Sequence, residues 1–190
     1  MSDAPLEANE PVPMRVGGLV VDPSTQVPVV ILRGIAEPRL YLPIFIGGLE
    51  ATAIASVLAA VKMPRPMTHD LMATLLDAMQ CRVTKVEVTR LDGGTFYASI
   101  TLADQSGGEL VLDARPSDAL ALALRTDASI AVHPAVLAEA GALAPEDEPP
   151  PEGVVATAPD AADEVEPAAA VTRETKLEDL EPEVFGKYKM

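Results

Sequence analysis

Two glycine-containing turns constrain the fold of this chain more than any other feature of its sequence. Asp92-Gly93-Gly94 and Ser106-Gly107-Gly108 each separate two runs of alternating or β-branched residues. Glycine supplies the positive φ angles that tight hairpin turns require. Strands are therefore predicted at 82–91, 94–103 and 108–113, joined as two antiparallel hairpins. The domain must contain a sheet that is at least partly antiparallel.

The remaining periodic segments are a mixture of strands and helices. The helix predicted at 49–62 is apolar almost all round, which indicates that it is buried. Paired strands with inserted helices are typical of an α+β fold, here a single compact domain with a mostly antiparallel or mixed sheet. The other predicted strands lie at 14–21, 27–33, 39–46 and near residue 130, and the other predicted helices at 68–80, 116–126 and 134–140.

Charge separates a domain from an acidic tail. Residues 14–141 hold 10 Lys and Arg against 13 Asp and Glu, whereas residues 142–190 hold 4 against 13. The stretch 142–172 is rich in Pro, Ala and acidic residues and has too little apolar surface to become ordered, so it is predicted to be a disordered acidic linker. Residues 1–13 are predicted to be a flexible N-terminus, and 173–190 a short helical segment that can dock on a protein partner.

Composition excludes several classes of protein. The chain of 190 residues has one cysteine, Cys81, so neither an internal disulfide nor a cysteine-based zinc cluster can form within it. No run approaches the roughly 18 apolar residues of a membrane span, and the first thirteen residues lack the pattern of a secretory signal. The expectation is a cytoplasmic protein that does not interact with a membrane.

Charged residues gather at the starts of two predicted helices. Thr68 is predicted to cap the first of them, which leaves His69 and Asp70 in its first turn. Pro116 suits the first position of the second helix. Free backbone N–H groups at a helix start favour anions, so two such starts brought together could hold a phosphate. The polar neighbours of that proline are Arg115, Ser117 and Asp118.

Five blocks of sequence carry a resemblance to a known family. They are Arg-Leu-Tyr-Leu-Pro-Ile-Phe-Ile-Gly at 39–47, Glu-Ala at 50–51, Pro-Arg-Pro-Met-Thr-His-Asp-Leu at 64–71, Gly-Thr-Phe-Tyr-Ala at 94–98, and the stretch from Asp113 to Arg125. In type and order these blocks resemble the bifunctional nuclease family, over roughly residues 14–141. The resemblance implies a small cytoplasmic bacterial domain. Since plant relatives are credited with both DNase and RNase activity, it also implies cleavage of DNA, RNA or both.

Phosphodiester cleavage indicates roles for the charged residues. It needs an activated water, stabilisation of developing charge and often a divalent ion. Histidine is the side chain whose ordinary pKa lies closest to neutral pH, which favours His69 as acid or base, with Glu50 and Asp70 completing the predicted catalytic set. Carboxylates also suit Mg²⁺ or Mn²⁺, for which Asp113 and Asp118 are the predicted ligands. The residues predicted to bind substrate are Arg65, Arg115, Ser117 and Arg125.

The same residues have structural interpretations. His69 and Asp70 can belong to an ordinary helix cap, and Asp118 can accept a hydrogen bond from the first N–H of its own helix. Arg125 can pair with carbonyls at a helix end. Glu50 can complement the positive end of the helix in which it lies.

A second class of function therefore stays open. Nucleic-acid affinity comes mostly from basic residues that neutralise phosphates, and the domain lacks a net positive charge. The alternative is a non-catalytic regulatory or ligand-binding module, dimeric through its Ala-rich helix, that recognises a small anion or a protein partner. A homo-oligomer is expected in either case, and the sequence leaves open whether the chain is an enzyme. The aromatic residues that could stack on bases are expected in the core instead: Tyr41, Phe45, Phe96 and Tyr97.

Overall fold

The computed structural model describes residues 10–145; the predicted C-terminal segment and most of the predicted linker lie outside the described residues. Every strand and helix predicted within residues 10–145 is present. No helix within residues 10–145 is long and apolar enough to cross a membrane. The strands are β1 (Val12–Val21), β2 (Pro28–Gly34), β3 (Leu40–Phe45), β4 (Arg82–Asp92), β5 (Thr95–Ala103), β6 (Glu109–Ala114), β7 (Ser129–Val132) and β8 (Ala142–Leu143), and the helices are α1 (Gly48–Leu58), α2 (Thr68–Ala78), α3 (Pro116–Thr126) and α4 (Pro134–Ala140).

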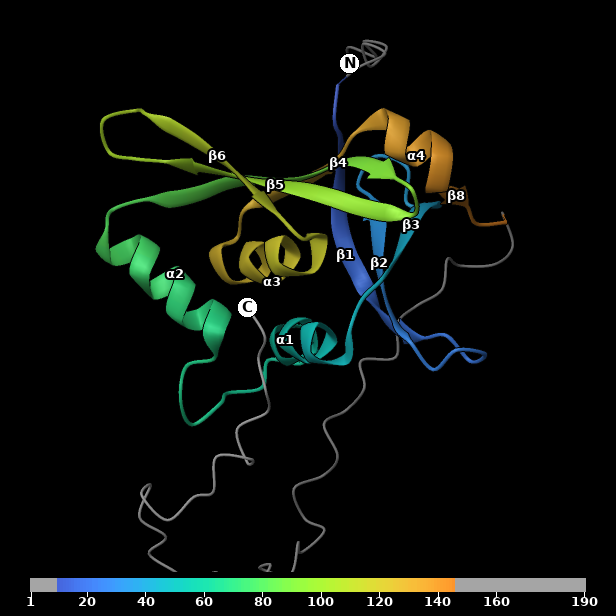
Figure 1. Cartoon of the computed structure of the whole chain (residues 1–190), viewed down its shortest axis with the longest axis horizontal. Coiled ribbons are helices and arrows are strands. Elements are labelled where there is room, and N and C mark those ends of the chain that lie inside the picture. Colours follow the sequence, from blue (N-terminus) through green and yellow to red (C-terminus); the bar gives the residue numbers. More distant parts are fainter. Residues whose placement is uncertain (1–9, 146–190) are drawn as a thin grey trace, which may run out of the picture. The chain divides into compact units, whose positions relative to one another are not determined.

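The strands of the described part form one mixed sheet in the order β6-β5-β4-β7-β1-β2-β3-β8. All neighbours are antiparallel except β4 and β7, which are parallel. α4 packs against both β3 and β4, which are not neighbours in the sheet, so the sheet must curve (Figure 1). The predicted α+β class is confirmed.

Backbone geometry explains why the two hairpin turns could be predicted. Gly93 and Gly94 have φ angles of +55° and +78°, and Gly107 has +82°. These values lie in the left-handed region, where a side chain would add strain. In the second turn, Asp104 Oδ1 also accepts backbone hydrogen bonds from Ser106 and Gly108, both at 2.8 Å. Each turn is therefore specified by its own residues rather than by distant packing.

The sheet continues beyond the predicted end of the domain at residue 141. Ala142 and Leu143 form β8, which pairs with Tyr41 and Leu40 at the edge of β3. A two-residue strand has no periodicity that a sequence pattern could reveal. The first residues of the predicted linker are therefore part of the sheet.

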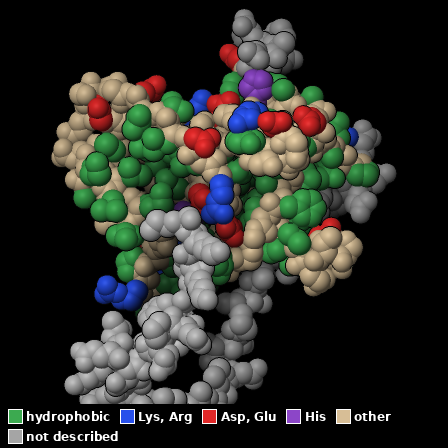
Figure 2. Space-filling model, in the orientation of Figure 1, with side chains coloured by type: hydrophobic (Ala, Val, Ile, Leu, Met, Phe, Trp, Pro, Cys, Tyr) green, Lys and Arg blue, Asp and Glu red, His purple; other side chains and the backbone are tan. Residues whose placement is uncertain are grey.

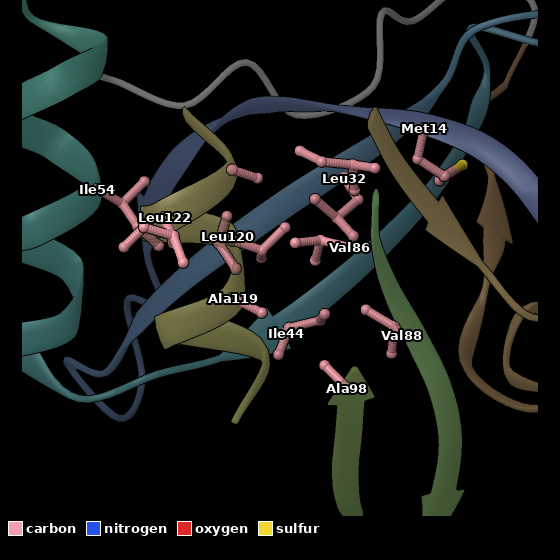
Figure 3. Packing of buried hydrophobic residues seen from close by; sticks show 14 of the residues in the cluster. Met14, Leu32, Ile44, Ile54, Val86, Val88, Ala98, Ala119, Leu120 and Leu122 are labelled. Carbon is pink, nitrogen blue, oxygen red and sulfur yellow. The ribbon is translucent and has the colours of Figure 1, made fainter. Parts of the chain in front are cut away.

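The core forms around α3, which lies between the sheet and α1 (Figures 1 and 3). Its residues Ala119 to Ala123 are all at most 1% exposed. Figure 3 shows Leu122 directed toward Ile54 of α1, and Leu120 directed toward the sheet near Val86. Alanines alternate with leucines in this stretch, so the helix can approach both layers closely. Because the core packs around α3, it also fixes the position of the residues at the N-terminus of this helix.

The prediction of a buried helix at 49–62 is wrong in extent and in burial. α1 ends at Leu58, and Ala60 just beyond it has a positive φ of 51°. Only Ala53 and Ile54 of this helix are buried, and Leu49 is 87% exposed to solvent. An apolar composition all round the helix does not show which side will be covered. One stripe faces α3, and the other apolar residues remain at the surface.

Helix α2 carries an exposed apolar surface. None of its residues is buried, and Leu71, Met72 and Leu75 are exposed, as is Met79 just after it. Figure 2 shows hydrophobic side chains gathered on the side of the face where α2 lies. The homo-oligomer expected from the sequence stays a prediction.

Candidate functional site

The start of α2 differs from the sequence prediction in its capping residue. Met67, with extended backbone angles, is the N-cap, and Thr68 is the first helical residue. Asp70 reaches back so that its Oδ2 accepts a hydrogen bond from the Met67 backbone N–H at 2.8 Å. The prediction that Thr68 caps this helix is therefore wrong by one residue. Asp70 supplies the capping carboxylate.

The other oxygen of Asp70 accepts a hydrogen bond from Arg125, which ties three helices together. Arg125 Nη1 donates to the carbonyl oxygens of Ala53 in α1 and Ala121 in α3, both at 2.9 Å. The side chain of Arg125 is only 7% exposed. Its hydrogen bonds go to groups inside the protein, and its predicted role in substrate binding stays a prediction. The structural interpretation is favoured for both Arg125 and Asp70.

Arg115 lies at the centre of a charged cluster. It is the N-cap residue of α3. Its Nε and Nη2 donate to Oδ2 and Oδ1 of Asp118 at 2.7 and 3.1 Å, and its Nη1 donates to Oε1 of Glu50 at 2.8 Å. Figure 2 shows a basic side chain flanked by acidic ones near the centre of the face, in the region of α1 and α3. A guanidinium has five N–H donors, so two remain for an anion.

His69 completes this cluster from α2. Its Nε2 lies 3.3 Å from Oδ1 of Asp118, and its side chain is 12% exposed. An ionised carboxylate can only accept, so the ring nitrogen that faces Asp118 carries the proton and Nδ1 of the neutral ring is the basic nitrogen. Glu50, His69, Arg115 and Asp118 are hereafter called the charged cluster. They come from the first turns of three helices.

Two predicted site residues lie apart from the charged cluster. Arg65 lies in the exposed segment between α1 and α2, and Asp113 is exposed on β6. Among the described residues, no hydrogen bond or ion pair joins either of them to the cluster. Within residues 10–145, no group of three or more His, Cys, Asp and Glu side chains is placed to hold a metal ion. The metal site predicted at Asp113 and Asp118 stays a prediction.

A groove of about 330 Å³ opens beside the charged cluster. Glu50 and Arg115 line one side of it, together with Ser117 of α3. Ser117 is 6% exposed, and none of the described residues receives or donates a hydrogen bond at its hydroxyl. Among the described residues, the Ser117 oxygen is not one of the fully buried side-chain atoms that lack a partner, so water or a ligand can reach it. The predicted role of Ser117 in binding remains a prediction, and this position supports it.

The groove also contains two aromatic residues that were expected in the core. Phe45, the last residue of β3, is 57% exposed, and Phe96 of β5 is partly buried. β3 turns Leu42 and Ile44 inward, so strict alternation directs Phe45 outward. This periodicity was the signal in the sequence that could have identified Phe45. The expectation of core placement is wrong for this residue.

Gly47 gives Glu50 the room to reach Arg115. A Cβ atom at Gly47 would overlap Oε2 of Glu50, whereas a Cβ atom at Gly48 would meet nothing within 4 Å. Gly47→Ala is therefore expected to displace the Glu50 carboxylate from Arg115 and to lower the free energy of unfolding by about 1 kcal/mol or less, because the carboxylate can swing away and its ion pair is accessible to solvent. Gly48→Ala should leave it unchanged or slightly raised, because alanine is preferred in a helix. Urea denaturation measures both.

A double-mutant cycle identifies the source of this loss. In a Glu50→Ala background the overlapping side chain is absent, so Gly47→Ala should no longer destabilise the protein. An equal loss in both backgrounds would show that Gly47 is needed for another reason.

The ion pairs lower the pKa values of two acidic side chains, Asp118 and Asp70. The hydrogen bond from Arg115 lowers the pKa of Asp118, with a smaller contribution from His69 and with burial opposing both. The hydrogen bond from Arg125 lowers the pKa of Asp70, followed by the bond from the Met67 backbone. The carboxylates in turn raise the pKa of Arg115. Both aspartates are therefore ionised at neutral pH.

These shifts predict a loss of stability in acid. A carboxyl group whose pKa is lower in the folded state contributes stability above its unfolded pKa of about 3.9, and this contribution disappears as the pH falls through the folded pKa. Urea denaturation between pH 7 and pH 2 should show the loss. Asp70→Asn should show a shallower dependence on pH, because it lacks one such group.

Two other aspartates, Asp22 and Asp104 in turns, add the same pH dependence to the unfolding curves of wild type and of Asp70→Asn. Hydrogen bonds from Ser24 and Thr25 lower the pKa of Asp22 to about 2, and those from Ser106 and Gly108 lower the pKa of Asp104. Both groups are intact in wild type and in Asp70→Asn, so the difference between the two curves isolates Asp70. Parallel curves would mean that Asp70 does not contribute.

Comparison with known proteins places the chain in a family. The model of the bifunctional nuclease domain matches residues 30–145, and the chain belongs to this family. It is also 42% identical, over 134 residues, to the uncharacterized proteins MT1877 and Rv1829 from two strains of Mycobacterium tuberculosis. These alignments cover 70% of this chain and 79% of each relative. The matched range includes the whole charged cluster and the groove.

Proposed function

We propose that this protein is a nuclease that hydrolyses phosphodiester bonds at the charged cluster. One observation carries the proposal: His69 of α2 contacts Asp118 of α3, Asp118 is paired with Arg115 at the start of the same helix, and Arg115 lines a groove. Membership of the bifunctional nuclease domain family supports the class of substrate. An imidazole paired with a carboxylate, next to an arginine with unused donors, is a combination suited to this chemistry.

The residues divide the reaction between them. The neutral Nδ1 of His69 takes a proton from a water whose oxygen bonds to phosphorus. The bond from phosphorus to the leaving ester oxygen breaks, and that oxygen takes up a proton from a second water molecule of the solvent. Asp118 holds the ring orientation and stabilises the imidazolium that forms. The two free N–H donors of Arg115 bind phosphate oxygens as negative charge develops.

The divalent ion predicted from the sequence does not fit the observed side chains. Glu50 and Asp118 are the two carboxylates of the charged cluster, and both accept hydrogen bonds from Arg115. An ion at these oxygens would have to displace the guanidinium. The proposed steps therefore use the protein side chains alone, and a dependence on Mg²⁺ or Mn²⁺ is a question for the assay below.

The charge balance of the cluster is also compatible with a non-catalytic alternative. Every carboxylate of the charged cluster is paired with Arg115, and the cluster carries two carboxylates against one guanidinium when His69 is neutral. Such a balance suits a structural network or a weak anion site as well as an enzyme. In this alternative the domain binds an anionic ligand or a protein partner without cleaving it.

The deciding experiment is a cleavage assay with the full chain. Purified wild type and His69→Ala are incubated with single- and double-stranded DNA and RNA, in Mg²⁺, Mn²⁺ or EDTA. The proposal expects cleavage by wild type that is strongly reduced in the variant. Equal cleavage by the two preparations would indicate a contaminant and, together with retained binding, would favour the alternative.

A further inference from the structure

The groove beside the charged cluster has features that the proposed cleavage steps do not use. Its wall includes Phe45 and Phe96, and the hairpin residues Gly94 and Thr95 border it. Phe45 is 57% exposed, an unusual position for a large aromatic side chain in a domain with so few of them. An exposed aromatic ring next to an arginine is a combination that suits a ligand with a flat apolar part and an anionic part.

The hairpin between β4 and β5 borders one end of this groove with Gly94 and Thr95. Gly93 and Gly94 form the tip between β4 and β5, and a Cβ atom at either position would meet nothing within 4 Å. Nothing in the described part of the chain therefore packs against the hairpin tip next to Phe96. A chain-like ligand could therefore leave the groove past the hairpin instead of ending inside it.

The tyrosines of the described residues do not present their rings to the groove. The ring of Tyr97 is covered by Arg90, whose guanidinium carbon lies 3.4 Å from the ring centroid. Tyr41 lies on β3, where it pairs in register with Arg33 and Ala142. Neither tyrosine lines the groove. The aromatic surface beside the charged cluster is therefore formed by the two phenylalanines.

We infer that this groove is a nucleobase-stacking subsite, which would make single-stranded nucleic acid the preferred ligand. One base stacks on the exposed ring of Phe45 against the wall formed by Phe96, and the adjacent phosphate meets the free donors of Arg115 and the hydroxyl of Ser117. Base stacking on aromatic side chains is tolerant of sequence because every base has a flat π-face. A base inside a duplex is already stacked on its neighbours and cannot enter.

Size and charge agree with this ligand. A volume of about 330 Å³ is near the lower limit for small-molecule pockets, which suits one base and its sugar rather than a larger ligand. Glu50 borders the groove, but Arg115 pairs with its carboxylate and reduces its repulsion of phosphate. Preferential cleavage of single strands rests on the proposed nuclease function, whereas preferential binding of single strands does not. Binding itself can be measured independently.

Binding of a labelled oligonucleotide tests the inference. Fluorescence anisotropy is measured with the full chain, in EDTA and low salt, with a fluorescein-labelled single strand and with the same sequence as a duplex. Wild type should bind the single strand more tightly. Phe45→Ala should weaken this binding about 5- to 150-fold, the range for loss of one stacked base, and leave duplex binding unchanged.

Three further variants separate stacking from general apolar contact. Phe45→Trp should restore tight binding, whereas Phe45→Leu should remain weak because it has no π-face. Val21→Ala is the matched control, since Val21 is similarly exposed at the end of β1 but does not line the groove. Unfolding curves for all variants confirm that they are folded.

The outcomes distinguish this inference from the proposed function. Binding that depends on Phe45, without any cleavage, supports the subsite and overturns the nuclease proposal. Cleavage that persists with unchanged single-strand affinity in Phe45→Ala overturns the subsite and leaves the nuclease proposal intact. Equal affinity of wild type for single strand and duplex also overturns the inference.

Discussion

Replacing His69 by alanine is expected to lower the turnover of nucleic acid roughly 10²- to 10⁴-fold, the usual contribution of a general acid or base. The reason is that Nε2 of His69 is held by Asp118, which leaves Nδ1 to accept the proton of the attacking water. Asp118→Asn should also reduce turnover strongly, because an amide can present a hydrogen-bond donor to the ring and does not stabilise an imidazolium. Initial rates at saturating substrate measure both variants.

The second histidine of the chain is the matched control. His133 is the N-cap of α4, where its Nδ1 accepts a hydrogen bond from the Ala135 backbone N–H at 3.2 Å. His133→Ala should lower the free energy of unfolding by about 1 kcal/mol, as expected for a lost cap, and leave turnover unchanged. If His69→Ala alters only stability, as His133→Ala does, His69 is a structural residue and the proposed mechanism is wrong.

The sequence identified individual residues of the candidate site better than it identified their partners. Helix-start patterns selected His69, Arg115 and Asp118, and the structure brings these three together. The pairing itself could not be predicted, because it depends on how α2 and α3 pack. Arg125, in the last turn of α3, illustrates the difference: its guanidinium group suggested a phosphate ligand, and helix packing places it among backbone carbonyls of two helices.

The fold was predictable where local residues determine it. The hairpin turns are specified by glycines with positive φ angles, so the antiparallel strands β4, β5 and β6 followed directly. β8 was missed because its two residues are held only by pairing with β3. The outward position of Phe45 follows from alternation along β3, yet a general preference for buried aromatics was given more weight. Local patterns therefore predicted elements, and tertiary contacts determined which residues became accessible.

Replacing Arg125 by methionine is expected to lower the free energy of unfolding by about 2–4 kcal/mol. The change removes the hydrogen bonds from one buried guanidinium to Ala53, Ala121 and Asp70, so the three helices lose the polar contact that they share. The Ala53 carbonyl keeps the hydrogen bond from the Ser56 hydroxyl, and Asp70 keeps the one from the Met67 backbone N–H. The loss should fall below the usual range for a broken buried ion pair, because the Asp70 side chain is 36% exposed and water can reach it. Urea denaturation at pH 7 measures the change.

Arg115→Met is the matched control for this prediction. Both arginines bond to an aspartate in the first turn of a helix, but Arg115 is 65% exposed and its ion pairs are accessible to solvent. Its replacement should therefore change the free energy of unfolding by about 1 kcal/mol or less. In the double variant Asp70→Asn/Arg125→Met, the combined loss should be smaller than the sum of the single losses, since each removes the same bond. Strict additivity, or equal losses for the two arginines, would show that Arg125 does not join the three helices energetically.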